Sequence, residues 1–369
     1  MATMKALVLH GPNDLRLDQV PKPKASPGSV VVRVKAVPLW DYLPEVINGS
    51  KNYPLTFPLI FGTCCVGHVE ETGPDVTSLQ PGMLVSTTSC TYEMRPRNAS
   101  CWVSYHGGFT PQEQRLSSGH WRDGCFAEYA AFPAENVHAL DEAQLLGRRN
   151  GLATIDQLTE LASVIPGMGA ANAIGVRAGE TVLVLPATGF FSSSAVAAVL
   201  GLGANVVVAG RSREKLQALV ERFGQDGNVV SVVLTGDAHQ DAVALRAATP
   251  GSRGADAYID YSPPAAAGTT HIEAGLLALK HYGRCCFAGV IVDKVPLPYA
   301  LIMSQCLTIR GQFAQSRDDV IQSIRLIETG NLKLTKTILR GFSLEEHEEA
   351  LKLAGQSGGF EKMVTFTLY

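Results

Sequence analysis

The sequence predicts an α/β protein in which a strand-rich, barrel-like part precedes a doubly wound parallel sheet. Short β-branched runs punctuated by Pro and Gly fill residues 1–150, and from about Ala153 helical segments alternate with β-branched runs. The first pattern is typical of antiparallel barrels and the second of parallel sheets. A chain of 369 residues exceeds one ordinary hydrophobic core, so we expect two domains.

The strands of the first part are expected where β-branched residues cluster between turn residues. They cover residues 5–9, 30–37, 66–72, 82–86 and 126–132. Residues 84–121 otherwise lack clear periodicity, and a loop of that length is usually a functional lid or an excursion. Its aromatic side chains can line a substrate pocket or form a small core of their own, and both alternatives stay open. These residues are Tyr92, Trp102, Tyr105, Phe109 and Trp121.

The second part contains six β-branched runs separated by helical stretches, as expected for a parallel sheet. The runs cover residues 182–185, 206–209, 229–234, 257–260, 284–288 and 307–311. After Gln315 come an amphipathic helix, a further segment, a second helix and a terminal strand, which we expect to return to the first domain. They cover residues 317–328, 334–342, 344–353 and 363–367. The predicted domains are therefore residues 1–150 with 316–369, and residues 151–315.

Residues 181–210 are the most informative stretch, because they predict strand, tight turn, helix and second strand in succession. The helix is expected at about residues 193–201 and the second strand at 205–209. This is the first half of a dinucleotide-binding βαβ unit, where the diphosphate packs on the helix N-terminus. Of the three fingerprint glycines only Gly189 is present, because Ala187 and Ser192 occupy the other positions and Thr188 lies between them. An ordinary strand-turn-helix that binds nothing stays open as an alternative.

The end of the second strand carries cations where an NAD site would carry a carboxylate. Gly210 is followed by Arg211 and Ser212, with Lys215 a turn later. These side chains can bind a ribose 2′-phosphate through charge-assisted hydrogen bonds, so the predicted cofactor is NADP(H). A solvated basic helix start is the alternative.

Charge and composition limit the classes of partner. The chain carries 31 basic and 34 acidic residues, for a formal net charge of −3, with no dense basic run. This argues against nucleic acid and anionic membranes as partners and favours a small-molecule substrate. Residues 181–210 hold no charge, but Pro, Gly and Ser divide them into elements too short to span a membrane. We find no signal peptide in the sequence, and its eight cysteines form no C-x-x-C pair. We therefore expect a cytoplasmic protein with reduced thiols.

A series of motifs in order along nearly the whole chain resembles the medium-chain dehydrogenase/reductase superfamily. They are Ser-Pro-Gly-Ser-Val-Val-Val-Arg-Val at 26–34, Asp41-Tyr42, Phe-Pro-Leu-Ile-Phe-Gly-Thr at 57–63, Val-Gly-His-Val-Glu-Glu-Thr-Gly-Pro-Asp-Val at 66–76, Gln-Pro-Gly-Met-Leu-Val at 80–85, Gly-Cys-Phe-Ala-Glu-Tyr at 124–129 and Arg-Ala-Gly-Glu-Thr-Val at 177–182. The resemblance implies a GroES-like catalytic domain made from both chain ends, a central Rossmann domain and an active site in the cleft between them. It is strongest to quinone-reductase-like and fungal alcohol-dehydrogenase-like members, some from secondary metabolism. A homodimer is one possible assembly.

The resemblance also indicates that the chain lacks zinc. Where zinc-dependent members place cysteine, histidine and glutamate, this chain has Pro38, Thr63 and Cys64. Residues 158–173, where the third ligand is expected, contain no Cys or His. Proline and threonine do not replace thiolate and imidazole in a tetrahedral zinc shell, so we predict no metal and the zinc-lacking branch of the superfamily.

Without a Lewis acid, hydride addition to a conjugated alkene or quinone is favoured over alcohol oxidation. The resemblance makes Tyr42 the main candidate donor to a substrate oxygen, with Asp41, Thr63 and His68 as weaker candidates. It further implies that a set of residues after the later strands contacts the cofactor: Ser262, Gly289, Val290, Ile291 and Gln312. A redox-inactive isomerase or cyclase and a non-catalytic nucleotide or quinone sensor stay open as alternatives.

Overall fold

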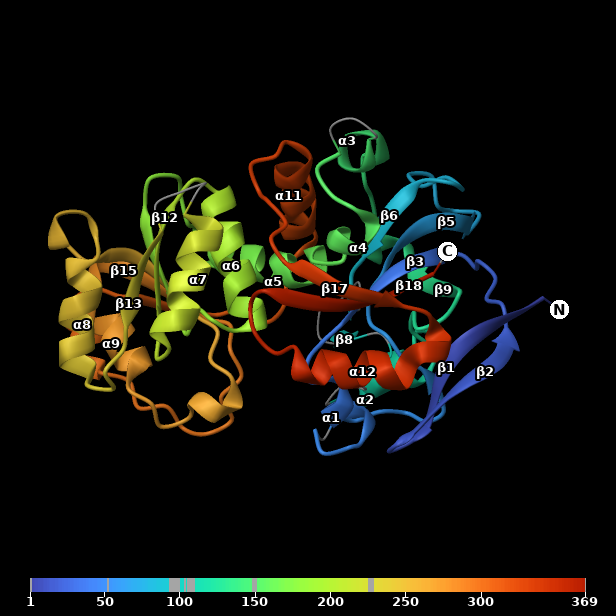
Figure 1. The fold of residues 1–369 in the computed structure, drawn as a ribbon, viewed down its shortest axis with the longest axis horizontal. Coiled ribbons are helices and arrows are strands. Elements are labelled where there is room, and N and C mark those ends of the chain that lie inside the picture. Colours follow the sequence, from blue (N-terminus) through green and yellow to red (C-terminus); the bar gives the residue numbers. More distant parts are fainter. Residues whose placement is uncertain are drawn as a thin grey trace. The chain divides into compact units, whose positions relative to one another are not determined.

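The computed structural model describes residues 2–51, 53–92, 100–102, 104, 110–147, 151–224 and 229–368. The chain divides into two compact units (Figure 1). Unit 1 comprises Met1–Ala162, Lys336–Gly358 and Lys362–Tyr369. Unit 2 comprises Ser163–Thr335 and Gly359–Glu361.

Unit 1 is built on three β-sheets. In the first, the strand order is β2 (Asp14–Pro21), β1 (Thr3–Gly11) and β4 (Leu59–Ile60). In the second, it is β10 (Val137–Ala139), β6 (Leu84–Thr87), β5 (Val66–Thr72), β3 (Ser29–Leu39), β18 (Lys362–Thr367) and β17 (Thr337–Phe342), with β9 (Tyr129–Pro133) also paired to β3. The third pairs β7 (Cys90–Tyr92) with β8 (Ser100–Trp102). The predicted strand-rich part is therefore confirmed.

One strand pair of unit 1 departs from the antiparallel pattern. Strands β17 and β18 run parallel, whereas the other pairs described in this unit are antiparallel. Parallel neighbours need a crossover connection, and the 3₁₀ turn η4 (Leu344–Glu346) and helix α12 (His347–Gln356) supply it. The remaining helices of unit 1 are α1 (Leu43–Ile47), α2 (Pro111–Ser118), α3 (Glu142–Leu146) and α4 (Ile155–Leu158), with a 3₁₀ turn η1 (Ala134–Asn136).

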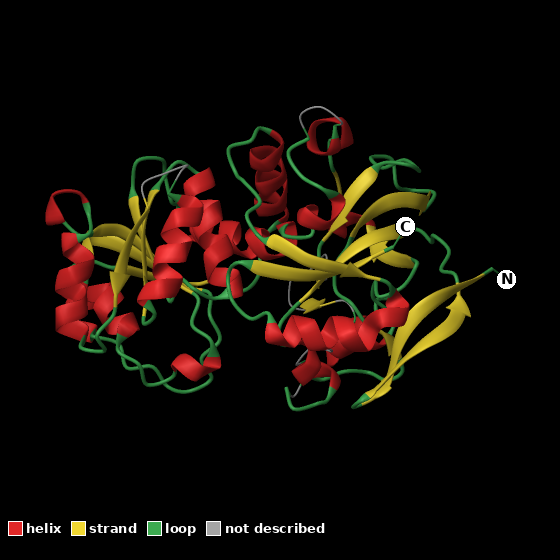
Figure 2. Cartoon of the chain, in the orientation of Figure 1, coloured by secondary structure: helices red, strands yellow, loops and turns green. Residues whose placement is uncertain are grey.

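Unit 2 contains the predicted parallel sheet, with helices on both faces (Figure 2). The strand order is β13 (Val229–Val233), β12 (Asn205–Gly210), β11 (Thr181–Leu185), β14 (Ala255–Asp260), β15 (Leu279–Phe287) and β16 (Thr308–Gly311), and every pair is parallel. In chain order this is 3-2-1-4-5-6, the order of doubly wound dinucleotide-binding folds. The α/β fold class is confirmed.

Alternating side chains assign the helices to the two faces of this sheet. Val182 and Val184 of β11 pack in a cluster with helices α5 (Leu161–Ala173), α6 (Phe190–Gly201) and α7 (Arg213–Phe223). Leu183 and Leu185 pack in a second cluster with α8 (Ala238–Ala247) and α9 (His271–Leu277). The uncharged stretch of residues 181–210 is explained by this burial on both sides. Helix α10 (Tyr299–Ser304) and the 3₁₀ turns η2 (Pro250–Ser252) and η3 (Pro264–Ala266) complete the connections.

Three sequence predictions differ from the structure. Helix α6 begins at Phe190 instead of residue 193, directly after its N-cap Gly189. Helix α11 (Arg317–Glu328), predicted to return to the first domain, belongs to unit 2, where the Asn172 amide donates to Asp319 Oδ1 at 2.6 Å. Helix α2 lies in the stretch without periodicity and starts with a capping box between Thr110 and Glu113.

The aromatic residues predicted for the excursion are only partly described. Tyr105 and Phe109 lie outside the described residues, and Tyr92 and Trp102 are described only as backbone of β7 and β8. Trp121 is partly buried. Its ring packs edge to face against that of His120, with 4.5 Å between the ring centroids. Among the described residues, no helix is long and apolar enough to cross a membrane.

Candidate functional site

The predicted cofactor residues of unit 2 all follow carboxyl ends of strands. Ala187 to Ser192 follow β11, Gly210 ends β12 and is followed by Arg211 to Lys215, and Ser262 follows β14. Gly289 to Ile291 follow β15, and Gln312 follows β16. Because these strands are parallel, the five turns lie along the same edge of the sheet. Strand β11 is flanked by β12 and β14, and this reversal of strand order is where such sheets bind ligands.

The turn between β11 and α6 is closed by serine rather than by glycine. The Gly189 N–H donates to Ser192 Oγ at 3.0 Å, and the Ser192 side chain is buried. Ala187 is also fully buried, and its N–H donates to Ala209 O at 2.9 Å. Gly189 is exposed and Thr188 is half-buried, so the accessible part of this turn is the 188–189 segment. Ser192 thus shapes the turn from inside.

The turn after β12 lies beside this segment and carries cationic side chains. A Cβ atom added to Gly210 would come within 3.9 Å of the Thr188 side chain, which shows how close the two turns are. Ser212 caps helix α7 by accepting from Lys215 N–H at 3.3 Å. Arg211 and Lys215 are exposed. A helix N-terminus with two cations is suited to a phosphate group.

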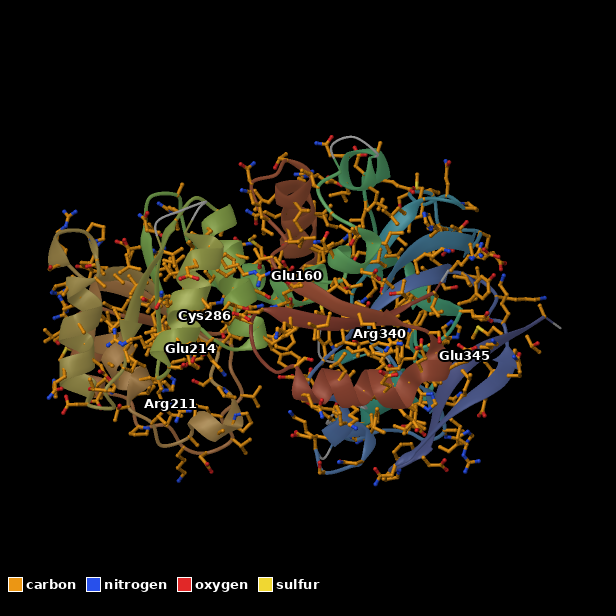
Figure 3. All side chains as sticks on the ribbon, in the orientation of Figure 1. Glu160, Arg211, Glu214, Cys286, Arg340 and Glu345 are labelled. Carbon is orange, nitrogen blue, oxygen red and sulfur yellow. The ribbon has the colours of Figure 1, made fainter. Side chains whose placement is uncertain are left out.

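Glu214 is a feature of this turn that the sequence reasoning missed. It lies in the first turn of α7, and Figure 3 shows it close to the start of that helix, with Arg211 below. Its carboxylate is exposed. Arg211 lies just before the N-cap Ser212 and Glu214 lies in the first turn of α7, so this closeness of opposite charges was visible in the sequence. The turn is cationic by a margin of two charges, since Arg211, Arg213 and Lys215 outnumber Glu214.

The turns after β14 and β15 touch through their backbones. Val290 N–H donates to Ser262 O at 2.8 Å, and Ala288 N–H donates to Asp260 O at 2.9 Å. A Cβ atom on Gly289 would lie 2.3 Å from the Ser262 nitrogen, so only glycine fits there. Val290 is 61% exposed and Ile291 packs against the core.

The last predicted cofactor residue, Gln312, closes the series at the end of β16. Its N–H donates to Phe287 O at 3.0 Å, and its side-chain amide donates to Ala314 O at 3.4 Å. Gln312 thus links the ends of β15 and β16, and the neighbouring Phe313 is 63% exposed.

Unit 1 holds the predicted catalytic residues Asp41 and Tyr42 between β3 and α1. Tyr42 is the N-cap residue of α1 and is half-buried. The Lys51 ammonium lies over its ring, 4.3 Å from the centroid. Burial raises the pKa of the Asp41 carboxyl, and the nearby Lys51 charge opposes that rise. A carboxyl group with a raised pKa retains its proton to higher pH and can act as a proton donor.

Thr63 and His68 have other surroundings within unit 1. The Thr63 hydroxyl is buried and donates to Cys64 Sγ at 3.6 Å. His68 lies on β5 with its Nε2 atom 3.6 Å from Glu142 Oε1. Their catalytic roles stay predictions without structural support.

Comparison with known proteins extends over both units. Residues 26–142 match the alcohol dehydrogenase GroES-like domain. An L-threonine 3-dehydrogenase of Streptomyces avermitilis is 26% identical over 99% of this chain and 100% of its own length. An acryloyl-coenzyme A reductase of Sulfurisphaera tokodaii is 25% identical over 95% of this chain and 96% of its own. A zinc-type alcohol dehydrogenase-like protein of Schizosaccharomyces pombe is 33% identical over 54% of this chain and 52% of its own.

Solved structures share the fold from end to end. The crystal structure of an NAD-dependent alcohol dehydrogenase superimposes with a TM-score of 0.75 at 23% identity, covering 99% of this chain and 100% of that one. The chain is thus similar, from end to end, to members of the medium-chain dehydrogenase/reductase superfamily. It is an enzyme of the oxidoreductase class, because its relatives in this superfamily are dehydrogenases and reductases.

The similarity to this superfamily raises the question of catalytic zinc, and the residues present do not fit it. Pro38 lies within β3 opposite Thr365, and Thr63 offers a hydroxyl only. Cys64 is buried, and of these three positions it alone offers a side chain of a type that zinc binds. Across the described ranges, no group of three or more His, Cys, Asp or Glu side chains can hold a metal ion. Zinc independence remains a prediction, and the zinc-type name of one relative belongs to that relative.

Proposed function

We propose that this oxidoreductase uses NADPH, without zinc, to reduce a small α,β-unsaturated carbonyl compound or a quinone. The observation that carries the cofactor choice is the turn after β12, where Arg211 and Lys215 are exposed beside the N-terminus of α7. A ribose 2′-phosphate gains charge-assisted hydrogen bonds from these groups. A 2′-hydroxyl would need a carboxylate at the strand end, and Gly210 occupies that position.

The remaining turns of unit 2 would hold the rest of the cofactor. The accessible 188–189 segment lies at the start of α6, where the helix dipole favours a diphosphate. Ser262, Gly289, Val290, Ile291 and Gln312 lie on the same sheet edge, and we propose that their turns support the adenosine and nicotinamide ends. When bound, the reduced cofactor supplies a hydride. Everything else that the reaction needs must come from side chains of this chain.

The chemistry on the protein side is the delivery of one proton. Reduction of a conjugated double bond takes up a hydride at the β-carbon and a proton on the resulting enolate, so the product gains two hydrogens. We propose that the Tyr42 hydroxyl donates to the enolate oxygen, with the neighbouring Asp41 carboxyl, whose pKa is raised by burial, as a weaker candidate. The similarity to an acryloyl-coenzyme A reductase supports a conjugated substrate.

The decisive experiment is a turnover assay of the purified protein with NADPH and a panel of enones, quinones, aldehydes and alcohols. Absorbance of the reduced cofactor and the mass of the product are followed together. An enone product two mass units heavier, formed only with NADPH, is the expected result. A product of unchanged mass that forms without cofactor would instead identify an isomerase or cyclase.

Zinc independence is tested separately by elemental analysis of the dialysed protein. We expect far less than one zinc per chain and turnover that survives a chelator. Stoichiometric zinc whose removal abolishes turnover would overturn this part of the proposal. The homodimer, the cytoplasmic location, a role in secondary metabolism and the assignment of residues 151–315 as the NADP(H)-binding domain also stay proposals.

A further inference from the structure

Five polar side chains meet at the carboxyl end of β14, inside unit 2. Tyr258, Asp260, Ser262 and His271 are all at least 94% buried, and Thr269 lies at the exposed end of the group. His271 is the first residue of α9. Tyr258 and Asp260 lie on β14, and Ser262 lies in the turn after it. Neither the sequence pattern nor the proposed reaction uses His271. A buried polar group of this size costs stability unless its bonds are made, so its presence needs a reason.

The five side chains form one continuous hydrogen-bonded chain. Thr269 Oγ1 lies 2.6 Å from His271 Nδ1, and His271 Nε2 lies 2.6 Å from Ser262 Oγ. Ser262 Oγ donates to Asp260 Oδ1 at 2.6 Å, and the Tyr258 hydroxyl donates to the same oxygen at 3.2 Å. His271 Nε2 is also 3.2 Å from Asp260 Oδ1. The imidazole is therefore the link between the surface end and the carboxylate end.

The combination of Ser, His and Asp suggests a hydrolytic triad, but the geometry rules that out. In a triad the serine and the aspartate bond opposite ring nitrogens of the histidine. Here Ser262 and Asp260 both face Nε2, while Nδ1 faces Thr269. Ser262 is only 1% exposed, so its hydroxyl is closed to a substrate. These side chains are hydrogen-bonded to one another and present no nucleophile to a ligand.

Two backbone hydrogen bonds beside these side chains join the turns after β14 and β15. The Ser262 carbonyl accepts from Val290 N–H at 2.8 Å, and the Asp260 carbonyl accepts from Ala288 N–H at 2.9 Å. Gly289 packs so closely that an added Cβ would lie 2.3 Å from Ser262 N and 2.5 Å from Ser262 O. Any displacement of residue 262 must therefore displace residues 288–290.

We propose that His271 is a positioning residue for cofactor binding, acting through Ser262 on the backbone of residues 288–291. This rests on the proposed function, in which that segment supports the cofactor. His271 itself touches no ligand. Its imidazole and the Asp260 carboxylate together fix the Ser262 side chain, and the backbone contacts carry that order to Gly289 and Val290.

The first test measures amide hydrogen exchange in residues 288–291 without any cofactor. In His271→Phe the ring is similar in size, but Ser262 Oγ loses its bond to the imidazole and keeps only the one to Asp260, and exchange should accelerate about tenfold or more. His271→Gln retains an amide donor toward Ser262 and should lie close to the native protein. Thr269→Val, at the exposed end of the chain, provides a milder variant in case His271→Phe does not fold, and it should accelerate the same segment less. His239→Phe is the matched control, because His239 is exposed on α8.

The second test measures NADPH affinity of the same variants by calorimetry. We expect His271→Phe to bind NADPH about tenfold more weakly and His271→Gln to recover most of that loss. Unchanged exchange in a folded His271→Phe protein would overturn the proposal, and so would faster exchange with unchanged affinity, or weaker affinity with unchanged exchange. If the native protein binds neither NADPH nor NADH, the proposed function fails, while the exchange result still decides whether His271 orders residues 288–291.

Discussion

The strand ends of unit 2 and the Asp41–Tyr42 segment of unit 1 hold their polar groups in different ways. In unit 2 the hydroxyls of Ser192, Ser212 and Ser262 bond within their own turns, so that backbone and exposed cations face outward. In unit 1 the polar groups are a half-buried tyrosine and a carboxyl whose pKa is raised by burial. Pre-formed turns favour binding, whereas groups that hold protons favour chemistry.

Substitutions in the two regions should therefore have different effects. Changes at the strand ends of unit 2 should alter cofactor affinity, and changes at Asp41 and Tyr42 should alter turnover or its pH dependence. The following substitutions are chosen to break or sharpen that division.

Tyr42→Phe should have the largest effect. Loss of a general acid typically lowers turnover by about 10²–10⁴-fold, and NADPH affinity should stay unchanged. Steady-state kinetics and calorimetry measure the two quantities separately. Tyr282→Phe is the control, because that tyrosine is 74% exposed in unit 2. Native turnover in Tyr42→Phe would remove Tyr42 from the reaction.

Arg211→Ala should weaken NADPH binding by about tenfold or more, since a hydrogen bond to a charged group contributes roughly 1.5–3 kcal/mol. NADH binding should change little, and turnover at saturating NADPH should be preserved. The exposed Arg253, replaced by alanine, serves as the matched control. If the native protein binds both cofactors equally well, the cationic turn does not select NADPH.

Glu214→Gln sharpens the same point with a smaller, opposite effect. Removal of an exposed like charge near the 2′-phosphate should tighten NADPH binding by about twofold to fivefold at low salt. The gain should fade as ionic strength rises, because exposed charges are screened. Glu221→Gln, on the same helix, is the control. A loss of NADPH affinity would mean that Glu214 assists binding instead of opposing it.

Asp41→Asn should have the smallest effect, visible as a change in how stability depends on pH. Because burial raises the pKa of Asp41 above 3.8, the folded chain binds this proton more tightly than the unfolded chain does. The free energy of unfolding therefore falls as pH rises from 3.8 through the folded pKa. The difference in melting temperature between Asp41→Asn and the native protein should therefore be more positive at pH 7 than at pH 3. Asp293→Asn, an exposed control, should not show this difference.

Local pattern was sufficient for most elements of the fold. The alternation around Val66–Thr72 predicted β5 with its observed bounds, and the amphipathic run predicted α11 in the same way. The start of α2 was missed although Thr110, Pro111 and Glu113 are a recognisable capping signal. Arg211 and Ser262 could be placed just after strand ends because the strands before them, β12 and β14, were predicted from their own residues.

The candidate site was less accessible to sequence reasoning wherever it depends on residues far apart. Lys51 lies over Tyr42 because the chain returns after α1, and no periodicity links the two positions. His271 reaches Ser262 across nine residues because α9 packs against β14. The assignment of α11 to unit 2 depends on its contact with Asn172, 147 residues earlier in the chain.

The sequence by itself determined the order and type of the elements, since side-chain periodicity and turn residues act within a few positions of one another. It also determined the charge at the end of β12, because Gly210 and Arg211 are adjacent. Only the tertiary structure decided which hydroxyls are satisfied internally, which carboxyl has its pKa raised by burial, and that His271 bonds Ser262. Those properties come from neighbours that packing brings together, and packing joins residues without regard to their separation along the chain.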